Sequence, residues 1–174
     1  MTTLSDLARE IHINAVAHGF WEGGERNFGE QVALMHAELS EALEEHRKGK
    51  PLEYFEDFKP EGVAVELADC AIRCFDTLVG TGASAHFLNR ATGEVEAAMR
   101  SPHTNFGEAI TVIHGWLTDA YDADSPTARH SHLVRVAVMC RALAESIGCT
   151  DWNGVIDRKM SYNATRPMLH GRRY

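Results

Sequence analysis

The sequence lacks the patterns that mark membrane-spanning and exported proteins. No apolar run approaches the roughly 18 residues that a helix needs to cross a bilayer. The N-terminal stretch MTTLSDLAREIH does not have the basic and then apolar order of a signal peptide. We therefore expect a cytoplasmic protein with no membrane partner.

Cysteine is scarce as well, with four residues and no Cys-x-x-Cys pair. Cys70 and Cys74 lie one helical turn apart in an otherwise apolar stretch. This spacing favours buried thiols over a zinc site or a disulfide.

Basic residues are outnumbered by acidic ones. The chain has 17 Lys and Arg against 25 Asp and Glu, and its net charge is -8. Contact with a nucleic-acid backbone depends on Lys and Arg that displace counterions. We therefore expect no nucleic-acid partner. A nucleotide substrate is still compatible with this charge, because a metal ion can bridge phosphates to acidic side chains.

Two catalytic patterns are also absent from the sequence. It contains no Gly-x-x-x-x-Gly-Lys-Ser/Thr segment, which excludes a P-loop for phosphate binding. None of the ten histidines follows a glutamate by three positions, as the Glu-x-x-His of ferritin-like di-iron proteins requires. A di-iron oxidase is therefore not expected.

The patterns that are present predict one all-α domain over residues 1–174. No segment alternates with period two for long enough to predict a strand. The stretch GKPLEYFEDFKPEG is expected to be a loop, Ser5 and Thr150 to cap helices, and Pro60 to open one. We expect helices at about residues 5–18, 28–46, 60–79, 84–99, 105–121, 127–147 and 150–163.

An internal repeat accompanies these helices. The segments NFGEQVALMHAEL (27–39) and NFGEAITVIHGWL (105–117) match at a constant offset, and 65–80 matches 134–148 more weakly with a one-residue gap. A duplicated helical hairpin predicts a four-helix core built from two hairpins, with flanking N- and C-terminal helices. Chance resemblance between amphipathic helices is the alternative.

Carboxylates gather on the two helices of the first copy. Glu38 and Glu41 share one stripe of the second expected helix, and Glu66 and Asp69 lie on the otherwise apolar third helix. Antiparallel packing of these neighbours brings the four side chains together. They would repel one another unless protonated or metal-bound, and an all-oxygen set suits Mg²⁺ or Mn²⁺. A solvated acidic edge is the alternative.

The second copy does not keep this set. The residues at the corresponding positions are Trp116, Asp119, Arg135 and Val138. Three of the four carboxylates are therefore missing, and we expect the second copy to act as a scaffold.

The acidic motifs resemble those of a known family. Glu-x-x-Glu, then 24 residues, then Glu-x-x-Asp resembles the signature of the MazG-like, all-α nucleoside triphosphate pyrophosphohydrolases. HGFWEGGERNFGEQVALMHAELSEALEEHRKGKP, PEGVAVELADCAIRCFDTL and the tail KMSYNATRPMLHGRRY also resemble small bacterial and phage members. The likeness covers about residues 10–80 and 150–174. The intervening stretch of about 70 residues departs from the pattern of the short members.

The resemblance and the internal repeat together divide the single domain into three functional parts. They are a catalytic half at about 1–80, a degenerate repeat at about 82–149, and a C-terminal segment at 150–174 that closes over substrate. A homodimer or higher homo-oligomer is expected. An internal pseudo-dimer is the alternative, because the repeat can replace in cis a helical partner from another subunit.

The resemblance also implies an activity. It is the Mg²⁺-dependent hydrolysis of (deoxy)nucleoside triphosphates to monophosphate and pyrophosphate, in control or cleaning of the nucleotide pool; Mn²⁺ is an alternative cation. Glu38, Glu41, Glu66 and Asp69 are the implied ligands. Glu38 and Glu41 are also the implied catalytic residues, with Glu41 orienting the attacking water.

The basic tail supplies the cations that the acidic site lacks. Lys159 and Asn163 are four residues apart on one helix face, and Arg166 follows just before Pro167 ends the helix. We expect these three, with Tyr162 as a further donor, to bind phosphates. Arg172 and Arg173 add positive charge. A solvated basic terminus is the alternative.

The sequence also suggests roles for two side chains near these motifs, Arg73 and Trp21. Arg73 is expected to pair with Asp69 or Asp76, or to orient them, and contact with substrate is the alternative. Trp21 is expected to be a core residue, and stacking on a base is the alternative.

The sequence is also compatible with other functions. Dimeric-type dUTPases and phosphoribosyl-ATP pyrophosphohydrolases use similar chemistry on narrower substrates. A non-catalytic helical module that binds nucleotide or protein is the rival from another class.

Overall fold

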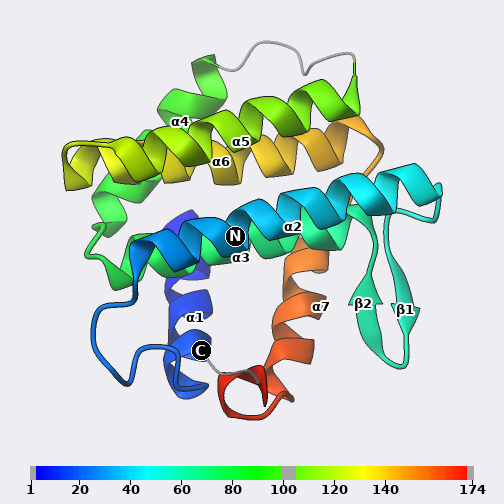
Figure 1. The fold of residues 1–174 in the computed structure, drawn as a ribbon, viewed down its shortest axis with the longest axis horizontal. Helices are drawn as coiled ribbons and strands as arrows, with labels where there is room; N and C mark the ends of the chain where they lie inside the picture. The colour runs from blue at the N-terminus through cyan, green and yellow to red at the C-terminus, as the bar shows by residue number, and fades with distance from the viewer. Residues whose placement is uncertain (1–2, 99–104, 172–174) are drawn as a thin grey trace.

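The computed structural model describes residues 3–98 and 105–171, and it confirms the all-α prediction (Figure 1). The strands of the described residues form one small two-stranded hairpin. The elements in chain order are α1 (Leu4–Ala17), α2 (Phe28–Lys48), β1 (Tyr54–Glu56), β2 (Lys59–Glu61), α3 (Val63–Gly80), α4 (Ala85–Ala98), α5 (Phe106–Asp122), α6 (Pro126–Ser146), α7 (Trp152–Ala164) and the short turn η1 (Met168–Gly171).

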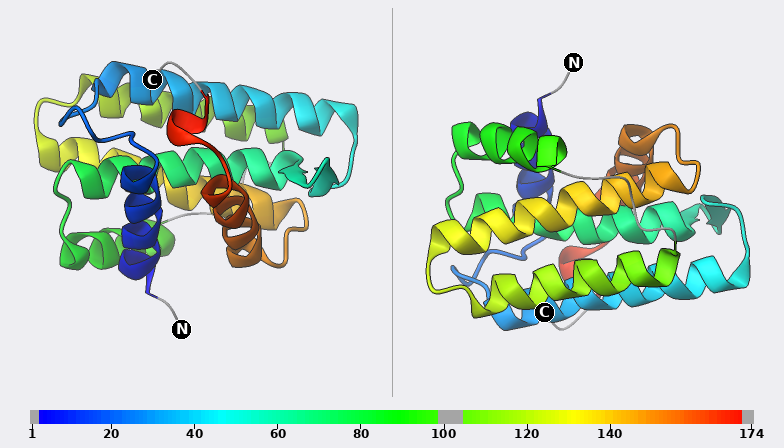
Figure 2. Two further views of the ribbon diagram at one scale, coloured as in Figure 1. Left: turned by 90° about the horizontal axis from the view of Figure 1, so that it is seen from below. Right: turned by 90° about the horizontal axis from the view of Figure 1, so that it is seen from above.

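Helix α3 lies at the centre of the molecule. Helices α2, α3, α6 and α5 contact one another in a closed ring, with α5 and α6 forming a layer over α2 and α3 (Figures 1 and 2). Helices α1 and α7 pack against α3 from the side opposite that layer, and α4 contacts α1 and α6. A helix with neighbours on most sides must be apolar on most sides, which explains the composition of α3.

The repeated Asn-Phe-Gly-Glu segments are helix N-termini. The Asn27 side chain accepts a hydrogen bond from the Glu30 backbone N–H at 3.0 Å and opens α2. Asn105 does the same with Glu108 at 3.2 Å and opens α5. The most similar part of the repeat is therefore a capping sequence.

The expected loop at 49–62 contains structure that the sequence did not predict. Strands β1 and β2 pair antiparallel through a two-residue turn, Asp57 and Phe58, both with positive φ. Each strand has three residues, which is too short for a visible alternation. Pro60 lies in β2, so its placement in a helix was wrong, and α3 begins after Gly62 at φ 114°.

Two expected caps are each displaced to a neighbouring position. The Thr3 side chain caps α1 together with Asp6, and Ser5 lies inside the helix. Asp151, rather than Thr150, accepts the hydrogen bond that opens α7. Boundaries of this kind depend on which of several adjacent cap-forming residues the packing selects.

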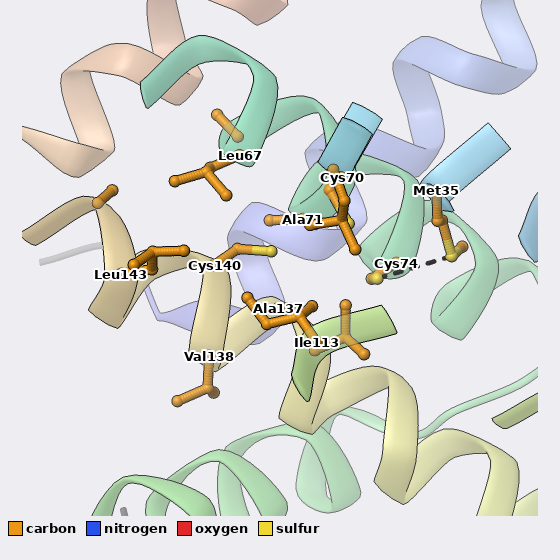
Figure 3. Packing of buried hydrophobic residues seen from close by; sticks show 14 of the residues in the cluster. Met35, Leu67, Cys70, Ala71, Cys74, Ile113, Ala137, Val138, Cys140 and Leu143 are labelled. Atoms are coloured by element: carbon orange, nitrogen blue, oxygen red, sulfur yellow. Dashed lines mark hydrogen bonds between the residues drawn. The ribbon is translucent and has the colours of Figure 1, made fainter. Parts of the chain in front are cut away.

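The core contains the cysteines, as expected. Cys70, Cys74 and Cys140 are free and fully buried, and the Cys74 Sγ lies 3.8 Å from the Met35 Sδ (Figure 3). Burial raises the pKa of the Cys74 thiol, and a hydrogen bond with Cys70, followed by burial, raises that of Cys140. These thiols are packing residues. None of the described helices combines the length and the apolar character that crossing a membrane requires.

Gly80 at the end of α3 provides a test of this packing. A Cβ at this position would overlap the indole ring of Trp21, which is held by a hydrogen bond from its Nε1 to Asp76 at 2.9 Å. We expect Gly80→Ala to lower the free energy of unfolding by about 1–3 kcal/mol in denaturant titration. Gly93→Ala in α4 is the control, since its Cβ meets nothing within 4 Å. It should be neutral or stabilising by up to about 1 kcal/mol. Equal effects of the two changes would contradict the Trp21 contact.

Candidate metal centre

Three of the four predicted acidic ligands come together. One carboxylate oxygen each from Glu38, Glu66 and Asp69 lies within 4.8 Å of the other two. Glu38 projects from α2, and Glu66 and Asp69 project from α3, one turn apart. Glu38 is 7% exposed and Glu66 is 4% exposed. These side chains therefore form a buried acidic group and not a solvated edge.

Glu41 takes a different place. Its side chain is exposed and lies outside the group of three, one turn beyond Glu38 on α2. Its charge is nevertheless close enough to contribute to the raised pKa of Glu66. Glu41 is thus at the solvent edge of the acidic group.

Burial disfavours the charged forms of the carboxylates in this acidic group. Loss of water, and then the Asp69 charge, raise the pKa of Glu66 to about 9, with Lys159 opposing the rise. Burial also raises the pKa of Asp69, which Lys159 partly offsets. Burial therefore disfavours simultaneous ionisation of Glu66 and Asp69, and a nearby cation relieves this cost.

Two basic side chains neutralise part of this charge. The Lys159 Nζ lies 2.6 Å from the Asp69 Oδ2, and the Arg73 Nε donates to the Glu38 Oε1 at 2.8 Å. The ion-pair partner of Arg73 is therefore Glu38 and not the expected Asp69 or Asp76, although Arg73 also interacts electrostatically with Asp69. Arg73 lies on the face of α3 that meets α2, where Glu38 is opposite, and Asp76 is already held by other donors.

Helix α7 brings only part of the predicted phosphate-binding set to the acidic group. Lys159 is 4% exposed and Asn163, one turn later on the same face, is 8% exposed. The Asn163 Oδ1 is buried and has no hydrogen-bond partner. Tyr162 and Arg166 are half-buried, and the Arg166 guanidinium lies over the Tyr162 ring at 5.9 Å from its centroid. Arg172 and Arg173 lie outside the described residues.

The hairpin contributes a cation that the sequence did not reveal. Lys59 in β2 forms an ion pair with Glu61 and interacts electrostatically with Glu66 and Tyr162. Burial opposes its charge, but these partners leave the pKa of Lys59 raised. Only a prediction of the hairpin would have placed Lys59 beside the acidic group.

Asp76, one turn before the end of α3, holds the loop between α1 and α2. Its carboxylate accepts hydrogen bonds from the Trp21 Nε1 at 2.9 Å and the Arg26 Nη1 at 3.2 Å, and the His12 Nδ1 lies at 2.8 Å. Burial raises the pKa of Asp76, and these partners oppose the rise. Trp21 is thus a half-buried packing residue with a bonded N–H.

The short turn η1 after α7 packs against the same loop. The Leu169 backbone N–H donates to the His18 carbonyl at 2.8 Å, and the His170 ring meets His18 and Phe20 edge to face. The segment that follows α7 is therefore fixed against the α1–α2 loop.

The chemistry of the donor set suits a hard divalent cation. Three carboxylates offer oxygen ligands only, and an ion with two positive charges would relieve the repulsion that raises their pKa values. The unpartnered Asn163 Oδ1 shows that this end of α7 has an unused polar group. Comparison of the chain with protein-family models, with curated proteins and with solved structures gave no match.

Proposed function

We propose that this protein is a Mg²⁺-dependent pyrophosphohydrolase of (deoxy)nucleoside triphosphates. The observation that carries the proposal is the buried convergence of Glu38, Glu66 and Asp69 beside Lys159. The resemblance to MazG-like enzymes supplies the reaction and the substrate class. Mn²⁺ is an alternative cation.

In this proposal Glu38, Glu66 and Asp69 bind the metal. A bound Mg²⁺ supplies charge neutralisation and lowers the pKa of a coordinated water. Glu41 is the residue that orients the attacking water, because an exposed carboxylate at the edge of the acidic group can reach both solvent and substrate. Glu38 assists as the ligand one turn away on the same helix.

The phosphates are bound by side chains from α7. Once Asp69 binds a metal ion, Lys159 no longer has to neutralise it, and its ammonium group can bind phosphate oxygens. In this proposal the Asn163 amide nitrogen donates to a phosphate oxygen, Tyr162 precedes it on α7, and Arg166 lies just beyond the end of that helix. Lys59 adds a cation from β2, beside Glu66 and Tyr162.

The assembly and the cellular role are part of the same proposal. The α5–α6 pair covers the α2–α3 pair within one chain, which supports an internal pseudo-dimer as the basic unit. A homodimer or higher homo-oligomer of such units is the proposed form. Control of the nucleotide pool in the cytoplasm is the proposed role.

One observation favours a second candidate function. The Lys159–Asp69 and Arg73–Glu38 ion pairs already neutralise two of the three buried carboxylates. The acidic group would then be structural, and the protein would be a helical module that binds nucleotide or protein without catalysis.

A substrate panel with pyrophosphate detection separates these functions. We expect Mg²⁺-dependent release of pyrophosphate from at least one canonical or damaged (d)NTP, with dUTP and phosphoribosyl-ATP included to test for a narrow substrate. Mg²⁺ alone should raise the melting temperature, because it binds only the folded state. Absence of both effects would favour the non-catalytic module.

A further inference from the structure

Two histidines meet on the other side of α2, where the two copies of the repeat pack together. His36 on α2 and His114 on α5 occupy equivalent repeat positions. Their Nδ1 atoms are 2.7 Å apart, and both rings are half-buried. Neither residue takes part in the proposed hydrolysis.

The two rings face each other through these nitrogens. The ring planes differ by 13° and the centroids are 4.9 Å apart. The ring centroids are farther apart than the two Nδ1 atoms by about two ring radii. This is the difference expected when both Nδ1 atoms lie on the line that joins the ring centres. The imidazoles therefore lie nearly in one plane, with one Nδ1 aimed at the other.

One proton occupies the space between the two nitrogens. A 2.7 Å contact requires one Nδ1 to carry hydrogen and the other to offer its lone pair. Burial lowers the pKa of both rings, and the neighbouring His36 lowers that of His114 further. The Cys70 thiol on α3 opposes this lowering of the His36 pKa. At neutral pH the pair carries no net charge. The shared proton occupies the position that a metal ion would take.

The spacing suits metal coordination. Two imidazole nitrogens at about 2.0–2.1 Å from one Zn²⁺ are about 2.9–3.4 Å apart, depending on the angle between them. To bind one ion, the two nitrogens would need to separate by a few tenths of an ångström. Each ring would also have to turn by about 35–45°, so that its Nδ1 lone pair points at the ion and not at the other nitrogen. Imidazole ligands suit Zn²⁺, Ni²⁺ and Cu²⁺, whereas Mg²⁺ takes oxygen. The Ser40 and Thr118 hydroxyls donate to the backbone carbonyls of His36 and His114 and are not ligands.

We propose that His36 and His114 form a second metal site, which binds one borderline transition-metal ion between its two Nδ1 atoms and completes its coordination with water. The site joins α2 to α5 and so links the two copies of the repeat. It is separate from the carboxylates of the first copy, and it does not depend on the proposed hydrolysis.

Calorimetric titration with Zn²⁺ tests the site, with excess Mg²⁺ present to occupy the carboxylates. We expect saturable binding of one Zn²⁺ per chain. His36→Gln and His114→Gln should each weaken it at least about tenfold, since each removes one of the two protein ligands. Binding should also weaken as the pH falls below the usual range of histidine, because protons compete for the same nitrogens.

Three controls make the outcome decisive. His86→Gln removes an exposed histidine on α4 and should leave Zn²⁺ binding unchanged. Glu66→Gln should also leave it unchanged. In the wild-type protein, Cu²⁺ should show electron paramagnetic coupling to two nitrogens, a readout that needs no variant to fold. Failure to saturate, or binding that survives loss of both His36 and His114, would overturn the proposal.

Discussion

Replacing Glu66 with glutamine should abolish magnesium-dependent hydrolysis and, at the same time, make the metal-free protein more stable. The first effect follows because Glu66 is a proposed ligand, and its loss should lower kcat/KM at least about a hundredfold. The second follows because the buried carboxylate is costly to ionise, with a pKa of about 9. A neutral amide of the same shape removes that cost, by on the order of 1–2 kcal/mol near pH 8.

The raised pKa of Glu66 also predicts how the stability of the metal-free protein changes with pH. Because the folded-state pKa of Glu66 lies above the ordinary value of 4.5, the folded protein binds more protons than the unfolded chain between these values. The stability of the metal-free wild type should therefore fall as the pH rises through this window. Thermal unfolding at several pH values should show a weaker fall in Glu66→Gln, and Mg²⁺ should raise the melting temperature of the wild type only.

Glu44→Gln is the matched control, because Glu44 lies on α2 but is exposed and paired with Arg47. It should change neither activity nor the response to Mg²⁺. A loss of activity in Glu66→Gln together with lower metal-free stability would indicate misfolding, and an unchanged response to Mg²⁺ would remove Glu66 from the metal site.

Lys159→Met should produce the largest loss of stability among single changes at this site. It removes the ammonium group that lies 2.6 Å from Asp69 and leaves a carboxylate with reduced access to water. Breaking one partner of a buried ion pair costs several kcal/mol. Protonation of Asp69 limits that cost, so we expect a loss of about 2–4 kcal/mol in denaturant unfolding at pH 8.

Magnesium should restore part of the stability of Lys159→Met, because the metal ion replaces the missing positive charge beside Asp69. Hydrolysis should not recover, because the proposed phosphate ligand is gone. Arg158→Met is the comparison at the adjacent position, since Arg158 pairs with Glu53 and Asp151 away from the acidic group. If Mg²⁺ rescues Arg158→Met equally, Lys159 has no special relation to the metal site.

The sequence was sufficient for the helices because their signals are local. Glycine, proline and capping residues divide the chain, and each amphipathic stretch indicates one helix. The hairpin was missed because strands of three residues show no period, and because the φ values of Asp57 and Phe58 leave no mark in the residue types.

The candidate site was predictable in part. Glu38, Glu66 and Asp69 could be placed together because their spacing on two adjacent helices fixes their direction. The pairing of Arg73 and the position of Lys59 could not be derived, since each depends on side-chain choices between elements distant in the sequence. Tertiary packing, which the sequence pattern does not specify, decided both.

The buried ion pair has a consequence for how the protein is made. Asp69 leaves the ribosome 90 residues before Lys159, so a growing chain holds its acidic side chains long before their counter-charge is synthesised. During that interval the α2–α3 hairpin can fold with its carboxylates protonated or open to water. Docking of α7 then brings Lys159 to Asp69, which couples completion of this ion pair to the synthesis of α7.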